Sequence, residues 1–145
     1  MIIITPYDAI GPVHFGMNEI EVRGLFGNPE AVTKDKRGNT VLRYEDKIAT
    51  IAAEGLVEVG FLPDASISVF GINPFSDPEA FEKLCELDGD PKEVLGFIIL
   101  LNLGLTMTGF HDGDESQKAI TVFSRDRWDV LKSEMKSYLL PKRFA

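Results

Sequence analysis

The sequence predicts an α+β fold of two duplicated units, residues 1–63 and 64–124, each a helix followed by an antiparallel sheet, and a closing helix over 125–140. The first observation is a repeated frame: Gly27-Asn28-Pro29-Glu30-Ala31-Val32 and Gly89-Asp90-Pro91-Lys92-Glu93-Val94 share their Gly, Pro and Val positions. The second is a series of short runs in which apolar and polar residues alternate between turn residues, which is typical of antiparallel strands. At 145 residues, without a low-complexity linker, the chain is expected to form a single domain.

The first unit opens with a predicted helix over 18–26. Asn18 is a suitable N-cap, and Glu21 stands in the capping-box position. Gly27, followed by a proline, is expected to end the helix. The apolar residues recur at helical spacing: Val22, Leu25 and Phe26.

The rest of the first unit is predicted to be an antiparallel meander. A charged turn ends in Gly38-Asn39, a hairpin signal. Three strands are expected after it, over 41–44, 48–52 and 56–62. Pro63-Asp64 breaks the pattern and is the expected boundary between the units.

The second unit is predicted to open with a strand over 67–71 and a helix over 77–88. Ser76-Asp77-Pro78-Glu79 combines a polar N-cap, a proline in the first turn and an acid at the positive end of the helix dipole. Gly89 should end this helix as Gly27 ends the first.

Residues 94–111 carry no formally charged residue, which raises the alternative of a membrane span. Asn102 and several glycines interrupt this run, so we expect two buried strands, 97–101 and 105–110, instead. A last strand is expected over 118–124. The closing helix is predicted from residues at three- and four-residue steps: Trp128, Leu131, Met135, Tyr138 and Leu139.

The composition limits the classes of partner. A formal net charge of −8 argues against nucleic acid and against an anionic membrane as partner. It is compatible with a basic protein partner, and equally with an acidic surface that only keeps the protein soluble. Cys85 is the only cysteine, so no intrachain disulfide and no cysteine-based zinc site is expected. The start, Met1-Ile2-Ile3-Ile4-Thr5-Pro6, has no signal-peptide pattern, so we expect a cytoplasmic protein.

Few residues suggest chemistry. His14 is expected to be a strand residue that faces a loop or solvent. His111 precedes Asp112, and a hydrolase that uses this pair is one alternative, but no Gly-x-Ser-x-Gly elbow supplies a nucleophile. No phosphate loop, dinucleotide fingerprint or histidine-rich metal spacing occurs, so we expect no cofactor, no metal and no enzyme activity. Cys85 is expected to be a small core residue.

The segment Phe15-Gly16-Met17-Asn18-Glu19-Ile20-Glu21-Val22-Arg23-Gly24-Leu25-Phe26-Gly27-Asn28-Pro29 resembles a family signature. It is similar to the start of the helix-plus-sheet repeats in two bacterial groups, the beta-lactamase inhibitory proteins and the small outer-membrane assembly lipoproteins. The inhibitors carry two such repeats in tandem. Val22, Leu25, Gly27 and Pro29 match scaffold positions, so the resemblance implies the fold alone. Both groups are exported, and the lipoproteins carry an acylated N-terminal cysteine, whereas this chain shows neither a signal-peptide pattern nor a cysteine there. By analogy it resembles small cytosolic bacterial proteins, some of which look like toxin-immunity proteins.

These observations predict a non-enzymatic protein-binding module, specifically an immunity protein that neutralises a bacterial toxin. The expected contact residues are acids of the second unit, at the helix exit and at the tip of the last hairpin: Glu86, Asp88 and Asp90, then Asp112, Asp114 and Glu115. A small-molecule or lipid carrier is a further alternative, because curved sheets can enclose a ligand against a helix. The sequence leaves the oligomeric state open.

Overall fold

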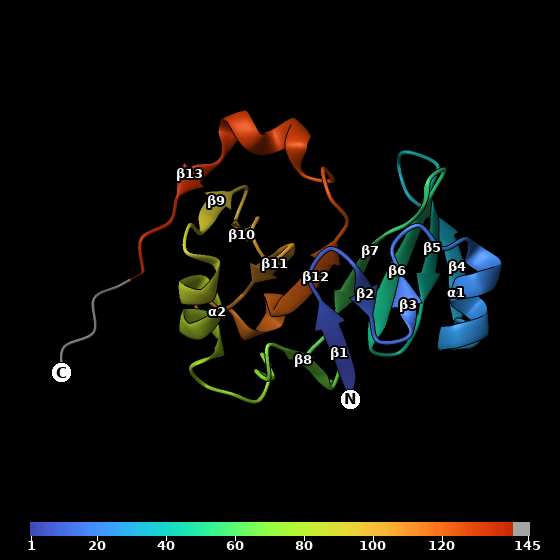
Figure 1. Cartoon of the computed structure of the whole chain (residues 1–145), viewed down its shortest axis with the longest axis horizontal. Coiled ribbons are helices and arrows are strands. Elements are labelled where there is room, and N and C mark those ends of the chain that lie inside the picture. The colour runs from blue at the N-terminus through green and yellow to red at the C-terminus, as the bar shows by residue number, and fades with distance from the viewer. Residues whose placement is uncertain (141–145) are drawn as a thin grey trace.

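A computed structural model describes residues 1–140 and shows an α+β fold that is mostly sheet (Figure 1). Two α-helices are present in the described residues, α1 (Glu19–Phe26) and α2 (Ala80–Asp88), with two short 3-10 helices, η1 (Glu115–Gln117) and η2 (Asp129–Glu134). The strands of the larger sheet are β4 (Ala31–Lys34), β5 (Thr40–Arg43), β6 (Lys47–Ala52), β7 (Gly55–Phe61), β9 (Lys92–Val94), β10 (Phe97–Leu100), β11 (Leu105–Thr108), β12 (Ala119–Phe123) and β13 (Lys136–Ser137). Those of the smaller sheet are β1 (Ile2–Thr5), β2 (Ala9–Ile10), β3 (Val13–His14) and β8 (Ile67–Val69).

The larger sheet is antiparallel throughout, in the order β13-β9-β10-β11-β12-β7-β6-β5-β4. Helix α1 precedes the meander β4–β7, and α2 precedes the meander β9–β12. The two meanders join through β7 and β12, where Val59 pairs with Val122. The strands of this sheet that alternation predicts are present, with ends that differ by at most two residues, whereas β4, β9 and β13 were not predicted.

The smaller sheet has the order β3-β2-β1-β8 and contains one parallel pair. Ile4 of β1 pairs with Val69 of β8 in parallel register, so the expectation of purely antiparallel pairing is wrong here. Strands β1 and β8 are far apart in the sequence, so no hairpin turn forces them to run in opposite directions.

Helix α1 begins and ends as predicted. The Asn18 side chain accepts a hydrogen bond from the Glu21 amide at 2.8 Å, and the Asn18 amide donates to the Glu21 carboxylate at 3.2 Å. Gly27 caps the end with a φ of 89°, and its amide donates to the Arg23 carbonyl. The capping box therefore fixes the start of the helix by side-chain chemistry that is visible in the sequence.

Helix α2 begins later than predicted, at Ala80. The residues before it form turns, in which an Asp77 carboxylate oxygen accepts from the Glu79 amide at 2.9 Å. Asp77 thus organises the approach to the helix without acting as its N-cap, because its hydrogen bond closes a local turn. Gly89 ends α2 in the left-handed conformation with a φ of 82°, as expected.

The predicted helix over 125–140 is wrong. This segment contains the 3-10 helix η2 and then the short strand β13, which pairs with β9 through Lys136 and Glu93. The Tyr138 amide also donates to the Pro91 carbonyl at 2.9 Å. The pairing of β13 with β9 therefore supplies hydrogen bonds to backbone groups that a continuous helix would have satisfied internally. The apolar residues of this segment pack on the sheet without forming an α-helix.

The main core lies on one face of the larger sheet. Buried residues of the sheet pack there against the smaller sheet and both α-helices, with Val22 of α1 and Leu84 of α2 fully buried. A second cluster, Val94, Ile99 and Phe123, lies on the other face, and Trp128 and Met135 pack against it. No helix within residues 1–140 is long and apolar enough to cross a membrane, and the uncharged run forms β10 and β11.

Candidate functional site

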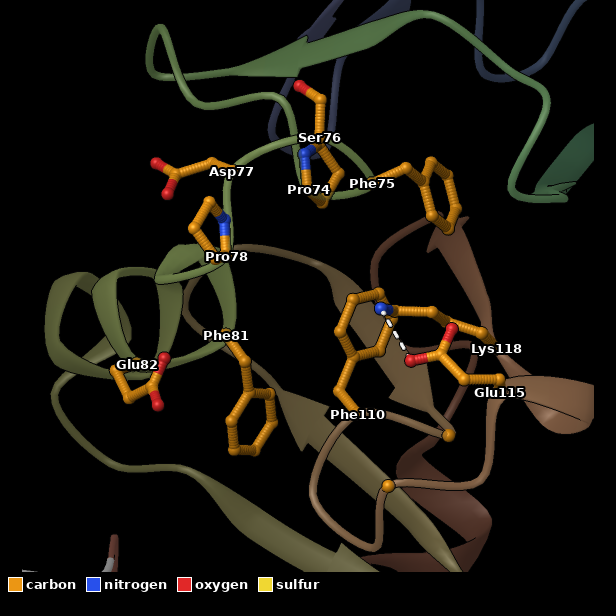
Figure 2. A pocket seen from close by; sticks show the side chains of 12 residues that line it. Pro74, Phe75, Ser76, Asp77, Pro78, Phe81, Glu82, Phe110, Glu115 and Lys118 are labelled. Atoms are coloured by element: carbon orange, nitrogen blue, oxygen red, sulfur yellow. Dashed lines mark hydrogen bonds and ion pairs between the residues drawn. The ribbon is translucent and has the colours of Figure 1, made fainter.

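A pocket of about 340 Å³ lies between the segment that leads into α2 and the loop that joins β11 to β12 (Figure 2). One wall is formed by the loop and first turn of α2, and the facing wall by the β11–β12 connection. Its lining residues are Pro74, Phe75, Ser76, Asp77, Pro78, Phe81, Glu82, Gly109, Phe110, Gly113, Glu115 and Lys118.

Three aromatic rings, those of Phe75, Phe81 and Phe110, line this pocket. The Phe110 ring centre lies 6.1 Å from that of Phe75 and 6.3 Å from that of Phe81, and the Phe81 and Phe110 planes are nearly parallel at 12°. Phe81 belongs to the main core and is 9% exposed, while Phe75 and Phe110 are half-buried. The core therefore holds the rings in place and leaves ring surface facing the pocket.

Charged groups stand above these rings. The Lys118 ammonium lies 4.8 Å from the Phe110 ring centre and 3.4 Å from a Glu115 carboxylate oxygen, and Figure 2 shows this pair beside the ring. On the facing wall Asp77 lies 2.8 Å from the Lys83 ammonium, and this hydrogen bond lowers the pKa of the Asp77 carboxyl. The pocket already holds one cation against an aromatic face.

The β11–β12 connection folds tightly because of a glycine. Gly109 has a φ of 79°, and a Cβ at this position would lie 2.5 Å from the Asp114 carbonyl oxygen. The Asp114 side chain then accepts from the Ser116 amide at 3.1 Å and caps η1. This turn directs Glu115 and Lys118 toward the pocket (Figure 2).

The predicted acids at this hairpin tip lie on the surface. Asp112, Asp114 and Glu115 are all exposed, and the Asp112 carboxylate accepts from the Asp114 amide at 3.1 Å. Glu115 alone among them lines the pocket. The three acids, which are close neighbours in the sequence, therefore form an exposed loop at the edge of the pocket.

The acids at the helix exit divide into two kinds. Glu86 and Asp90 are exposed, and Asp90 lies 3.2 Å from the Lys92 ammonium. Asp88 is 4% exposed, so the expectation that it faces a partner is not met. Its carboxylate accepts from the amides of Asp90 and from those of Asn102 and Leu103 in the β10–β11 turn. Burial raises the pKa of Asp88.

His111 is held by aromatic rings. Its ring lies 6.4 Å from that of Phe81 and 5.8 Å from that of Tyr138, and its Nδ1 is buried without a hydrogen-bond partner within residues 1–140. His14 is exposed as expected and lies 3.1 Å from Asp8.

Cys85 is buried as expected, and burial raises the pKa of its thiol to about 12. This thiol therefore stays protonated at neutral pH and is a poor nucleophile. Among the described residues no cluster of metal-ligating side chains occurs.

The pocket was not predicted from the sequence. No sequence pattern assigned a role to Phe75, Phe81, Phe110 or Lys118. The prolines on either side of Phe75 are the single local signal near the site, since they indicate that this segment is a loop. Only the tertiary fold brings this loop against the β11–β12 connection.

Comparisons of this chain with protein-family models, with curated proteins and with solved structures found no match. The resemblance of residues 15–29 to the inhibitor repeats therefore stays a prediction.

Proposed function

We propose that this chain is a non-enzymatic protein-binding module, an immunity protein that neutralises a basic bacterial toxin. The observation that carries the proposal is the exposed acidic loop of Asp112, Asp114 and Glu115 beside an aromatic pocket. The formal net charge of −8 gives this loop a background of the same sign.

Charge explains how such a module would work. A toxin that cleaves nucleic acid needs a basic surface for phosphates. An acidic inhibitor occupies that surface and associates rapidly, because opposite potentials steer the two proteins together. Glu86 and Asp90 add exposed negative charge at the exit of α2.

We propose that the fold arose as a tandem duplication of a helix-plus-sheet unit, as in the beta-lactamase inhibitory proteins. Each helix is followed by a four-stranded meander, and the meanders are joined edge to edge through β7 and β12. Gly27 and Gly89 end the two helices at corresponding places in the repeated frame. These correspondences support residues 1–63 and 64–124 as the two units.

The competing functions have less support. The hydrolase alternative needs a polar partner for His111, whereas its ring packs against the rings of Phe81 and Tyr138. The carrier alternative needs an apolar cavity, whereas four charged side chains line this pocket. A lipid chain would have to displace the hydration of those groups at a large cost.

The variant Asp112→Asn, Asp114→Asn, Glu115→Gln is expected to bind the partner with an on-rate reduced about ten-fold at low salt, because it removes the steering charges. The amides keep the acceptor oxygens that the Asp114 and Ser116 amides use, so the loop should stay folded. The partner is first captured from an extract of the native host with the wild-type chain. Its association is then measured by surface plasmon resonance at several salt concentrations.

A matched control neutralises three exposed acids of the first unit and its boundary: Glu45→Gln, Glu54→Gln and Asp64→Asn. It changes the net charge equally, so it should retain most of the wild-type on-rate. Equal on-rates for all three proteins, or binding that is insensitive to salt, would contradict the role of the acidic loop.

A further inference from the structure

We propose that the pocket between α2 and the β11–β12 connection is a receptor for one arginine side chain of the protein partner. This inference rests on the proposed function, and it specifies which chemical group of the partner is recognised. The rings, the charges and the size of the pocket each point to this group.

The aromatic surface favours a flat cation. The Phe110 ring lies next to those of Phe75 and Phe81, and the Lys118 ammonium lies 4.8 Å from the centre of the Phe110 ring. A guanidinium is planar and weakly hydrated, so it stacks on such rings at a lower desolvation cost than an ammonium does.

The charges of the lining favour a cation as well. Among the residues that the structure describes, Asp77, Glu82 and Glu115 line the pocket together with one cation, Lys118. Asp77 is held by Lys83 at 2.8 Å. The Glu115 side chain is 79% exposed and meets Lys118 through only one of its oxygens, Oε1. Its carboxylate is therefore placed to accept a guanidinium from the solvent side.

The pocket is large enough for one long side chain. A volume of about 340 Å³ is at the lower limit of small-molecule sites. A nucleotide would bring phosphates against three acids and one lysine, which is electrostatically unfavourable. An arginine at the tip of a partner's loop matches both the volume and the sign of the charge.

The test is an NMR titration of the full chain with N-acetyl-arginine amide, which needs no partner protein. We expect saturable shifts of the Phe75, Phe110 and Glu115 resonances, with a dissociation constant on the order of millimolar. The neutral analogue N-acetyl-citrulline amide has nearly the same shape and should bind about ten-fold more weakly, because it lacks the charge-assisted hydrogen bond.

Two variants localise the binding. Glu115→Gln should weaken arginine binding about ten-fold, whereas the matched surface variant Glu45→Gln should leave it unchanged. Phe110→Leu should also weaken it by removing the stacking face. Phe110→Leu also disturbs packing, so a loss of binding in that variant alone does not decide the test. Glu115 is exposed, and the NMR spectrum of its variant shows whether the chain is folded, so the result for Glu115→Gln decides the test.

Several results would overturn the assignment: no saturable shift at the pocket, equal binding of the citrulline analogue, or equal binding of N-acetyl-lysine amide. These results are independent of the function proposed above. If a partner is captured but arginine does not bind, the pocket assignment alone fails. If arginine binds but the host contains no protein partner, the immunity function fails and the arginine site stands.

Discussion

Replacing Gly55 by alanine is expected to lower the free energy of unfolding by about 3 kcal/mol or more, because of backbone strain together with steric overlap. Gly55 has a φ of 104°, and a Cβ there would overlap the Gly16 carbonyl and lie 2.8 Å from the Gly16 Cα. This contact is fixed on both sides. The Gly16 amide donates to the Leu56 carbonyl at 3.0 Å, and the Leu56 amide donates to the Met17 carbonyl at 2.8 Å. The strand β7 and the entry to α1 would have to separate.

Gly89→Ala is the matched control for this prediction. Gly89 also has a positive φ, 82°, but a Cβ added there would meet no atom within 4 Å. The alanine should therefore cost only about 1 kcal/mol, from the left-handed conformation alone. Urea unfolding followed by circular dichroism measures both variants. Equal losses for the two would show that the Gly55–Gly16 contact does not constrain the fold.

Replacing Asp88 by alanine is expected to cost about 3 kcal/mol of unfolding free energy, because three buried or partly buried amide donors lose their acceptor. The Asp88 carboxylate joins the end of α2 to the β10–β11 turn through the amides of Asn102 and Leu103, and it also accepts from the Asp90 amide. Asp88→Asn should cost less, since one oxygen remains for the turn while the new amide group faces the Asp90 N–H. Thermal or urea unfolding measures the order. An alanine variant as stable as the asparagine variant would contradict this role.

The contribution of Asp88 to the stability of the fold is also expected to depend on pH. Burial raises the pKa of Asp88 above its ordinary value of 3.8, so the folded chain binds this proton more tightly than the unfolded chain does. The stabilisation from this proton is present below 3.8 and is lost as the pH rises through the folded pKa. The stability difference between wild type and Asp88→Ala should therefore grow as the solution is acidified from neutral pH. A difference that shrinks on acidification would contradict the assigned pKa direction.

The fold was predictable wherever local chemistry decides it. Asn18 and Glu21 fix the start of α1, and Gly27 and Gly89 end the two helices. The strands that alternate clearly were also predictable. The parallel pairing of β1 with β8 was not, because it joins segments that are distant in the sequence and share no turn.

The C-terminal segment shows how a tertiary contact overrides helical spacing. Trp128 and Met135 stand at helical spacing, yet they pack on the second face of the sheet from the irregular segment that contains η2. The pairing of β13 with β9 supplies backbone hydrogen bonds that no sequence pattern announces. Local periodicity alone could not distinguish these two outcomes.

The candidate site was predictable only in its charges. Asp112, Asp114 and Glu115 stand in a polar turn, and such turns lie on the surface. Asp88 belongs to the same acidic stretch as Glu86 and Asp90 by sequence, but the approach of the β10–β11 turn buries it. The aromatic wall of the pocket depends on contact between segments that are distant in the sequence, such as those of Phe75 and Phe110.

The most direct measurement of the proposed function is growth of a bacterial culture that expresses the captured partner, with and without this chain. We predict that the partner alone stops growth and that the wild-type chain restores it. The control with Glu45, Glu54 and Asp64 neutralised should restore growth as well, whereas the variant with Asp112, Asp114 and Glu115 neutralised should restore it poorly. Failure of the native host to yield any protein partner, or a partner whose expression leaves growth unchanged, would contradict the immunity function.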